Sequence, residues 1–112
     1  MLNQVVLVGR LVKNPELKKS ERDKSYSFIT LAIPRAYKNT DGKYDSDFID
    51  CILWDGVAKN TAEYCKKGDI VGVKGRLQSD VKEQNDGSKK YYTNIIAEKI
   101  TFLSNTKQEE AG

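Results

Sequence analysis

The stretch DFIDCILWDG, residues 47–56, decides the fold, because a β-strand pattern in it runs directly into the start of a helix. Side chains alternate across a strand, and one face of this strand is purely apolar, with Ile49, Cys51 and Leu53. The opposite face carries Phe48, Asp50, Ile52 and Trp54. A carboxylate is seldom buried without a partner, so we predict that Phe48 and Trp54 lie on a face in contact with water. In the alternative, both rings belong to the core and Asp50 marks a bend.

Two strands are predicted before this stretch. Residues 4–12 are β-branched and aliphatic, and residues 25–33 alternate between apolar and more polar side chains. Pro34 is expected to end the second strand, and the loop KNTDGK (38–43) contains the Asp-Gly turn signal of a hairpin. The third strand, 47–54, is then the hairpin partner of the second.

One helix and two more strands follow. Asp55 can cap the helix, apolar residues recur at helical spacing up to Cys65, and Gly68 stands where a C′ glycine would close it. Residues 70–77 are predicted to form the fourth strand and residues 91–103 the fifth, with a second hairpin turn, NDGS, between them.

This order of elements predicts an all-β fold, namely a five-stranded OB-fold Greek-key barrel with one short helix between strands 3 and 4. The fragments LVGRL (7–11) and VKGRL (73–77) each place a glycine inside a strand, which is tolerated where a strand bends or bulges. A β-sandwich would need more strands, and a ferredoxin-like fold a second helix. We expect a single domain over residues 1–103 and a short polar C-terminal end over residues 104–112.

The sequence offers little for catalysis or metal binding. It contains no histidine, its two cysteines are far apart, and the acids of YDSDFID do not converge on one strand face. We therefore predict that the protein is not an enzyme and uses no metal and no cofactor. Because no signal peptide or membrane-spanning stretch is visible, we expect a cytoplasmic protein without a membrane partner. In that compartment Cys51 and Cys65 are expected to be reduced, buried thiols, with a disulfide as the less favoured alternative.

A binding function explains the aromatic face better, although a formal net charge of +3 is only weak evidence for an anionic partner. Strands 2 and 3 of an OB barrel carry the surface that meets oligonucleotides or oligosaccharides. Phe48 and Trp54 are roughly 20 Å apart along their strand, which suits two separate platforms for bases. Phe28, on the non-core face of the second strand, and Tyr37, near its end, can extend this surface. Cationic side chains are candidates for phosphate contacts: Arg10, Lys18, Lys19, Arg35, Lys67, Arg76, Lys82, Lys89 and Lys90.

A family resemblance covers nearly the whole chain. It is carried by an ordered set of segments: NQVVLVGRL (3–11), ITLAI (29–33), an F-x5-W strand followed by EYCKKGD (63–69), VKGRL (73–77) and YYTNIIAEKITFL (91–103). This set resembles the bacterial-type single-stranded DNA-binding proteins. The resemblance implies an OB fold, a homotetramer or a dimer, and sequence-tolerant binding of single-stranded DNA. It also implies a nucleoid-associated role in replication, recombination and repair, or in DNA uptake or phage replication.

The resemblance assigns roles to individual residues. The family's stacking aromatic at the end of strand 2 falls on Tyr37, and those of strand 3 fall on Phe48 and Trp54. The family lysine before the glycine that opens strand 4 falls on Lys67, and a further stacking position, in the last hairpin, falls on Lys82.

Other positions depart from the family pattern. Positions that are often basic fall on Asp50 and Asp80, and the chain ends in QEEAG, where long-tailed members carry an acidic tip. The resemblance is therefore to a short variant, or to a member from which the tail has been removed, and no tail-mediated recruitment of repair enzymes is expected. Two alternatives stay open: an RNA-binding OB module, and a protein–protein adaptor on the same fold, which Asp50 and Asp80 would favour.

Overall fold

The computed structural model describes residues 1–104, which form strands and one helix. In chain order these elements are β1 (Val5–Leu11), β2 (Lys18–Lys19), β3 (Ser25–Lys38), β4 (Tyr44–Trp54), α1 (Asp55–Tyr64), β5 (Ile70–Glu83) and β6 (Lys89–Ser104). The predicted order is confirmed, with the two-residue β2 as an addition. Apart from residue 104, the predicted polar C-terminal end lies outside the described residues.

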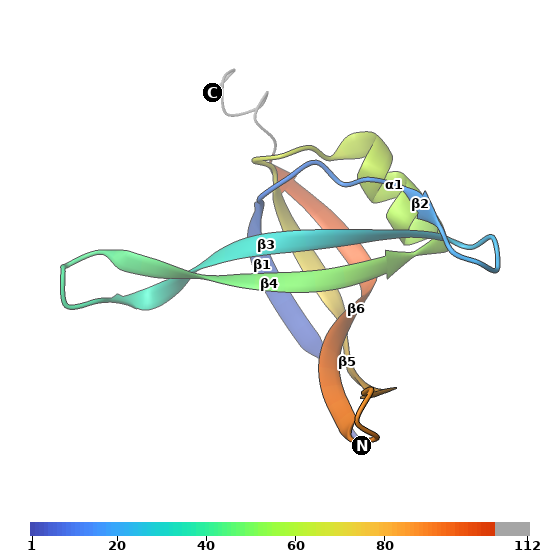
Figure 1. Ribbon diagram of the computed structural model, residues 1–112. Helices are drawn as coiled ribbons and strands as arrows, with labels where there is room; N and C mark the ends of the chain where they lie inside the picture. Colours follow the sequence, from blue (N-terminus) through green and yellow to red (C-terminus); the bar gives the residue numbers. More distant parts are fainter. Residues whose placement is uncertain (105–112) are drawn as a thin grey trace.

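The long strands close into a barrel. The sheet order is β1-β5-β6-β4-β3-β2, and β1 also pairs with β3, which closes a ring of five strands (Figure 1). The β4–β6 pair is parallel and the other pairs are antiparallel. Helix α1 connects β4 to β5, so the predicted OB-type barrel with a helix between its third and fourth long strands is confirmed.

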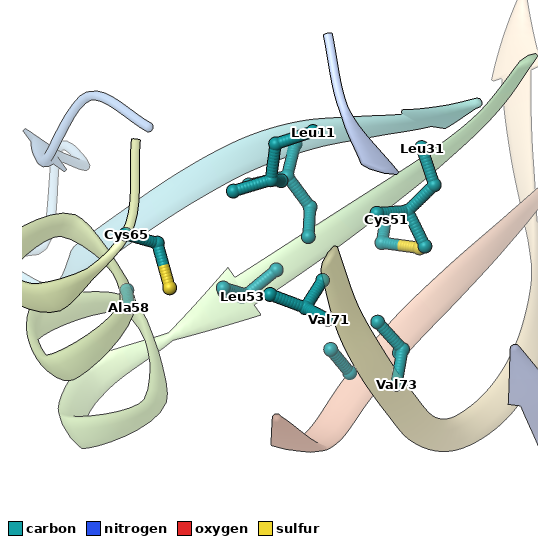
Figure 2. Close-up of a cluster of buried hydrophobic side chains, with 10 residues drawn as sticks. Leu11, Leu31, Cys51, Leu53, Ala58, Cys65, Val71 and Val73 are labelled. Atoms are coloured by element: carbon teal, nitrogen blue, oxygen red, sulfur yellow. The ribbon is translucent and has the colours of Figure 1, made fainter. Parts of the chain in front are cut away.

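The barrel encloses a core built from the inner faces of its strands. Leu53 and Leu31 are completely buried, and Cys51 is 1% exposed, as the strand alternation predicts. Ala58 of α1 and Cys65 close one end of this cluster (Figure 2). The alternation that buries these side chains places the next residues of each strand on the outer face, where the candidate site lies.

Both cysteines are free thiols in this core, as predicted. Burial, and to a smaller extent a neighbouring carboxylate, raises the pKa of Cys51 and of Cys65 to about 11. The carboxylates are those of Asp50 and Asp69 respectively. The thiols therefore stay protonated, and unreactive, over the neutral range.

These shifts predict a loss of stability at high pH. The thiols of the unfolded chain ionise near pH 9, whereas those of the folded chain resist ionisation up to about 11. The stabilising contribution is present below pH 9 and is lost as the pH rises towards 11. We expect the free energy of unfolding, measured with urea, to fall over this interval. A double variant with Cys51→Ala and Cys65→Ala should lack this part of the decline, and an identical decline in both proteins would contradict the assignment.

Two hairpins extend beyond the barrel as arms (Figure 1). The β3–β4 arm comprises residues 33–47 and the β5–β6 arm residues 78–94. The radius of gyration, 16.1 Å, exceeds the roughly 13 Å expected of a compact domain of this length because of these arms. The prediction that Pro34 ends the second strand is wrong. β3 continues to Lys38 through a register shift between Pro34 and Lys38, and a proline without an N–H is tolerated at such an irregularity.

The ends of α1 also differ from the sequence prediction. Asp55 is the first helical residue, with a φ of 51°, and no side chain caps the helix. The helix ends at Tyr64, so Gly68 is not its C′ residue. Gly68 has a φ of 96° in the turn that leads into β5, where its N–H donates to the carbonyl of Leu11. The glycine is therefore needed for the turn rather than for the helix.

Candidate nucleic-acid interface

Three aromatic rings gather on the outer face of β3 and β4. Trp54 lies directly opposite Tyr26 in the β3–β4 register, and their ring centroids are 5.5 Å apart. Phe28, two residues further along β3, meets Tyr26 edge to face at 5.7 Å. Trp54 is half-buried, whereas Phe28 is 51% exposed. The rings hold each other in place and still present apolar surface to the solvent.

Phe48 and Asp50 continue this face toward the β3–β4 arm. Phe48 is 66% exposed, so the alternative of a buried Phe48 is wrong. Asp50 is exposed and lies opposite Thr30, whose hydroxyl donates a hydrogen bond to the carboxylate at 2.6 Å. The charge between the two aromatic residues is therefore solvated and partnered, as the strand alternation indicated.

A groove of about 310 Å³ crosses from these rings to β5 and β6. Its walls combine apolar side chains, two carboxamides and one carboxylate: Phe28, Ile52, Trp54, Ile96, Gln78, Asn94 and Asp80. The carboxylate of Asp80 accepts hydrogen bonds from Asn94 at 2.6 Å and from Gln78 at 3.2 Å. Flat apolar rings beside amide groups suit a planar, partly polar ligand such as a nucleobase.

Cationic side chains flank the rings on several sides. Lys18 lines a small recess together with Phe28, Lys13 and Glu16. Arg76 lies opposite Ile96 in the β5–β6 register, next to the groove. Arg10 lies opposite Ala32, which in turn lies opposite Phe48, but its guanidinium donates a hydrogen bond at 2.7 Å to the carbonyl of Gly68, in the turn before β5. The face thus combines apolar rings with cations at its border, and it also carries the carboxylates of Asp50 and Asp80.

A model of the single-strand binding protein family matches residues 2–103. The chain belongs to this family. It is 40% identical to single-stranded DNA-binding protein B of Bacillus subtilis over 111 residues, which cover 99% of this chain and 98% of that protein. It is 46% identical to single-stranded DNA-binding protein 3 of Listeria innocua over 112 residues, which cover the whole chain and 69% of that protein. The single-stranded DNA-binding protein of Bacillus cereus is 44% identical over 103 residues, 92% of this chain and 61% of that protein. The resemblance inferred from the sequence is confirmed.

Some predicted contacts of this family member lie away from the rings. Tyr37, 68% exposed, belongs to the β3–β4 arm beyond Pro34. Arg35 of the same arm is bound to Asp47 at 2.9 Å, and this hydrogen bond raises the pKa of Arg35. A phosphate would have to compete with that carboxylate for the guanidinium. The roles of Tyr37 and Arg35 in binding stay predictions.

Other predicted lysines are distributed over different faces. Lys67 lies in the turn after α1, where its backbone N–H donates to Asn14 at 2.7 Å and so links this turn to the recess beside Phe28. Lys19 pairs with Asp23 at 3.8 Å. In the β5–β6 arm, Lys82 and Lys90 are cross-strand partners, whereas Lys89 lies opposite Glu83 on the other face of the hairpin. Their contacts with a ligand stay predictions.

Tyr26 was not among the predicted binding residues. The alternation of β3 puts it on the same face as Phe28, and this signal was visible in the sequence. Its contact with Trp54 depends on the β3–β4 register, which the hairpin length alone did not define because of the irregularity after Pro34.

Within residues 1–104, no group of three or more acidic or cysteine side chains is arranged to hold a metal ion. In the same part of the chain, no helix has the length and apolar character needed to cross a membrane.

Proposed function

We propose that this protein binds single-stranded DNA without sequence preference, as a non-catalytic protein of replication, recombination and repair. The observation that carries the proposal is the outer face of β3 and β4, where Phe28, Phe48 and Trp54 are accessible in a chain of the single-strand binding protein family. Every base has a π-face, so stacking on such rings contributes about 1–3 kcal/mol per base regardless of sequence.

Phosphate contacts would supply the rest of the binding free energy. Lys18 and Arg76 border the rings and can meet the backbone of a DNA strand whose bases lie on them. A phosphate at Arg10 would have to compete with the Gly68 carbonyl, which accepts a hydrogen bond from the guanidinium at 2.7 Å. The acids on this face, Asp50 and Asp80, are hydrogen-bonded to neutral groups. Because these carboxylates repel phosphate, this chain should bind single-stranded DNA more weakly than a variant with neutral residues at positions 50 and 80.

The same rings could stack on the bases of RNA. Nothing on this face singles out a 2′-hydroxyl as a required partner, so RNA binding is the alternative within the same class of function. Equal affinity for oligo(rU) and oligo(dT) would favour that alternative. No affinity for either would favour a protein–protein adaptor.

We also propose that copies of the chain associate through the outer face of β1. Val6 and Val8 are 67% and 52% exposed, and Leu103 of β6 is 50% exposed. A Cβ at Gly72, which lies opposite Val8, would be 3.7 Å from Leu103, so these apolar side chains are neighbours. Such a patch suits a self-complementary contact in a dimer or in a homotetramer, and light scattering measures the number of copies.

A salt titration tests the electrostatic part of the proposal. Binding of labelled oligo(dT) should weaken as salt rises, with a slope of about −0.7 for each phosphate that is neutralised. Lys18→Ala should reduce the magnitude of this slope by about 0.7, because Lys18 lies beside Phe28. Lys59→Ala, which removes the same charge from an exposed position on α1, is the matched control and should leave the slope unchanged. Equal slopes in both variants would remove Lys18 from the site.

A further inference from the structure

Tyr92 of β6 lies on the same face as the groove. β6 pairs with β5 without a register shift from Lys89 to Ala97, so its alternate residues point the same way. Asn94 and Ile96 line the groove together with Trp54. Tyr92 is two residues before Asn94, and its side chain therefore continues the groove wall onto the β5–β6 arm.

The ring of Tyr92 is accessible and carries positive charge beside it. It is 39% exposed, and the Lys90 ammonium lies 5.3 Å from its centroid. Lys82 is the cross-strand partner of Lys90 and adds a second cation on this face. An accessible ring with two lysines next to it combines a stacking surface with phosphate contacts.

The β3–β4 and β5–β6 arms diverge from the residues where β4 pairs with β6. Ile52 lies opposite Ile96 in the parallel β4–β6 pair. Phe48 is four residues before Ile52 and Tyr92 four residues before Ile96, so each ring is about 13 Å from this row. Because the strands are parallel, both residues lie on the same side of the row, Phe48 at the base of the β3–β4 arm and Tyr92 on the β5–β6 arm. Figure 1 shows these two arms leaving the barrel in different directions.

We propose that Tyr92, with Lys90 and Lys82, is a stacking position for nucleotides that flank those bound at Trp54 and Phe28. This assignment rests on the proposed function and deepens it, since it places an aromatic ring on the β5–β6 arm, where the family's stacking position falls on Lys82. Asp80 lies directly opposite Tyr92, with its carboxylate held by Asn94. A bound DNA strand would run past the Asp80 carboxylate as it leaves the groove for the β5–β6 arm.

The neighbouring tyrosine provides a matched control. Tyr91 is 68% exposed and lies opposite Val81 on the other face of the same hairpin. Substitution of either residue removes an exposed tyrosine ring from the β5–β6 arm, so the two variants differ only in the face that loses the ring. Only the loss of Tyr92 should affect a ligand that lies on the groove face.

The test compares Tyr92→Leu, Tyr91→Leu and Tyr92→Phe by fluorescence anisotropy with labelled oligo(dT) of about 4 and about 16 nucleotides, the two ends of the site sizes of OB folds. Tyr92→Leu should weaken binding of the longer oligonucleotide about tenfold and barely affect the shorter one. Tyr91→Leu should match the wild type with both, and Tyr92→Phe should retain the affinity because the ring is kept. Melting temperatures of all three variants report on folding.

Two outcomes would overturn the assignment. If the wild type binds the longer oligonucleotide and Tyr92→Leu binds it equally well, Tyr92 is not a stacking position although the proposed function stands. If the wild type binds neither oligonucleotide, the proposed function fails and the assignment fails with it.

Photocrosslinking of the wild type to oligo(dT) with 5-iodouracil substitutions needs no variant. Crosslinks at Tyr92 are expected, and crosslinks at Tyr91 alone would contradict the assignment.

Discussion

Trp54→Ala is expected to weaken binding of single-stranded DNA by about 1–3 kcal/mol, a loss of about fivefold to 150-fold in affinity. This range is the established contribution of one stacked base in proteins of this kind. The effect should be large because Trp54 is the bulkiest ring of the cluster and is positioned by Tyr26 at 5.5 Å. Equilibrium titration with labelled oligo(dT) measures the change.

The fold should survive this substitution. Trp54 is half-buried, and its backbone precedes α1 without a side-chain cap, so alanine removes no capping interaction. A buried tryptophan would behave differently, because its loss costs about 3–5 kcal/mol of stability. Trp54→Phe is the control and should keep most of the affinity. If Trp54→Ala has a much lower melting temperature but its folded fraction binds oligo(dT) with the affinity of the wild type, the ring stabilises the core and does not contact the ligand.

Gly75→Ala is expected to destabilise the protein by about 3 kcal/mol or more. A Cβ at this position would lie 2.0 Å from the carbonyl oxygen of Ile96, a backbone atom of the paired strand. The strand cannot yield without breaking its pairing, and the register already shifts between Lys74 and Gly75. Urea unfolding of the variant measures the loss.

Gly72→Ala is the matched control in the same strand. A Cβ at Gly72 would meet its nearest neighbours at 3.7 Å, which is ordinary van der Waals contact. We expect its free energy of unfolding to stay within about 1 kcal/mol of the wild type. Similar stabilities for Gly75→Ala and Gly72→Ala would contradict the close approach of β5 and β6 at Gly75.

The arrangement of strands and faces was predictable because it depends on local patterns. Period-two alternation in residues 47–54 separates buried Cys51 and Leu53 from exposed Phe48, and this separation is independent of the partner strand. The glycine of VKGRL indicated an irregular strand, and the register shift at Gly75 confirms it. Asp-Gly turn signals placed both hairpins.

What the sequence left open depends on contacts between distant residues. The continuation of β3 past Pro34 requires β4 as a partner, whereas local propensity alone predicts that the strand ends at the proline. Lys18 reaches Phe28 only because the segment before β3 folds back through β2. The position of Tyr92 on the groove face follows from the β5–β6 register over a long arm, which no local signal defines.

The intrinsic fluorescence of Trp54 tests most directly whether the outer face of β3 and β4 holds the bases. Trp54 is the only tryptophan, so its emission reports on this face without a label. Titration of the wild type with oligo(dT) should quench the emission and reach saturation together with binding measured by anisotropy, because a base stacks on the indole. Emission that is already blue-shifted in the free protein, and that stays unchanged at saturating oligo(dT), would show that single-stranded DNA does not bind on this face.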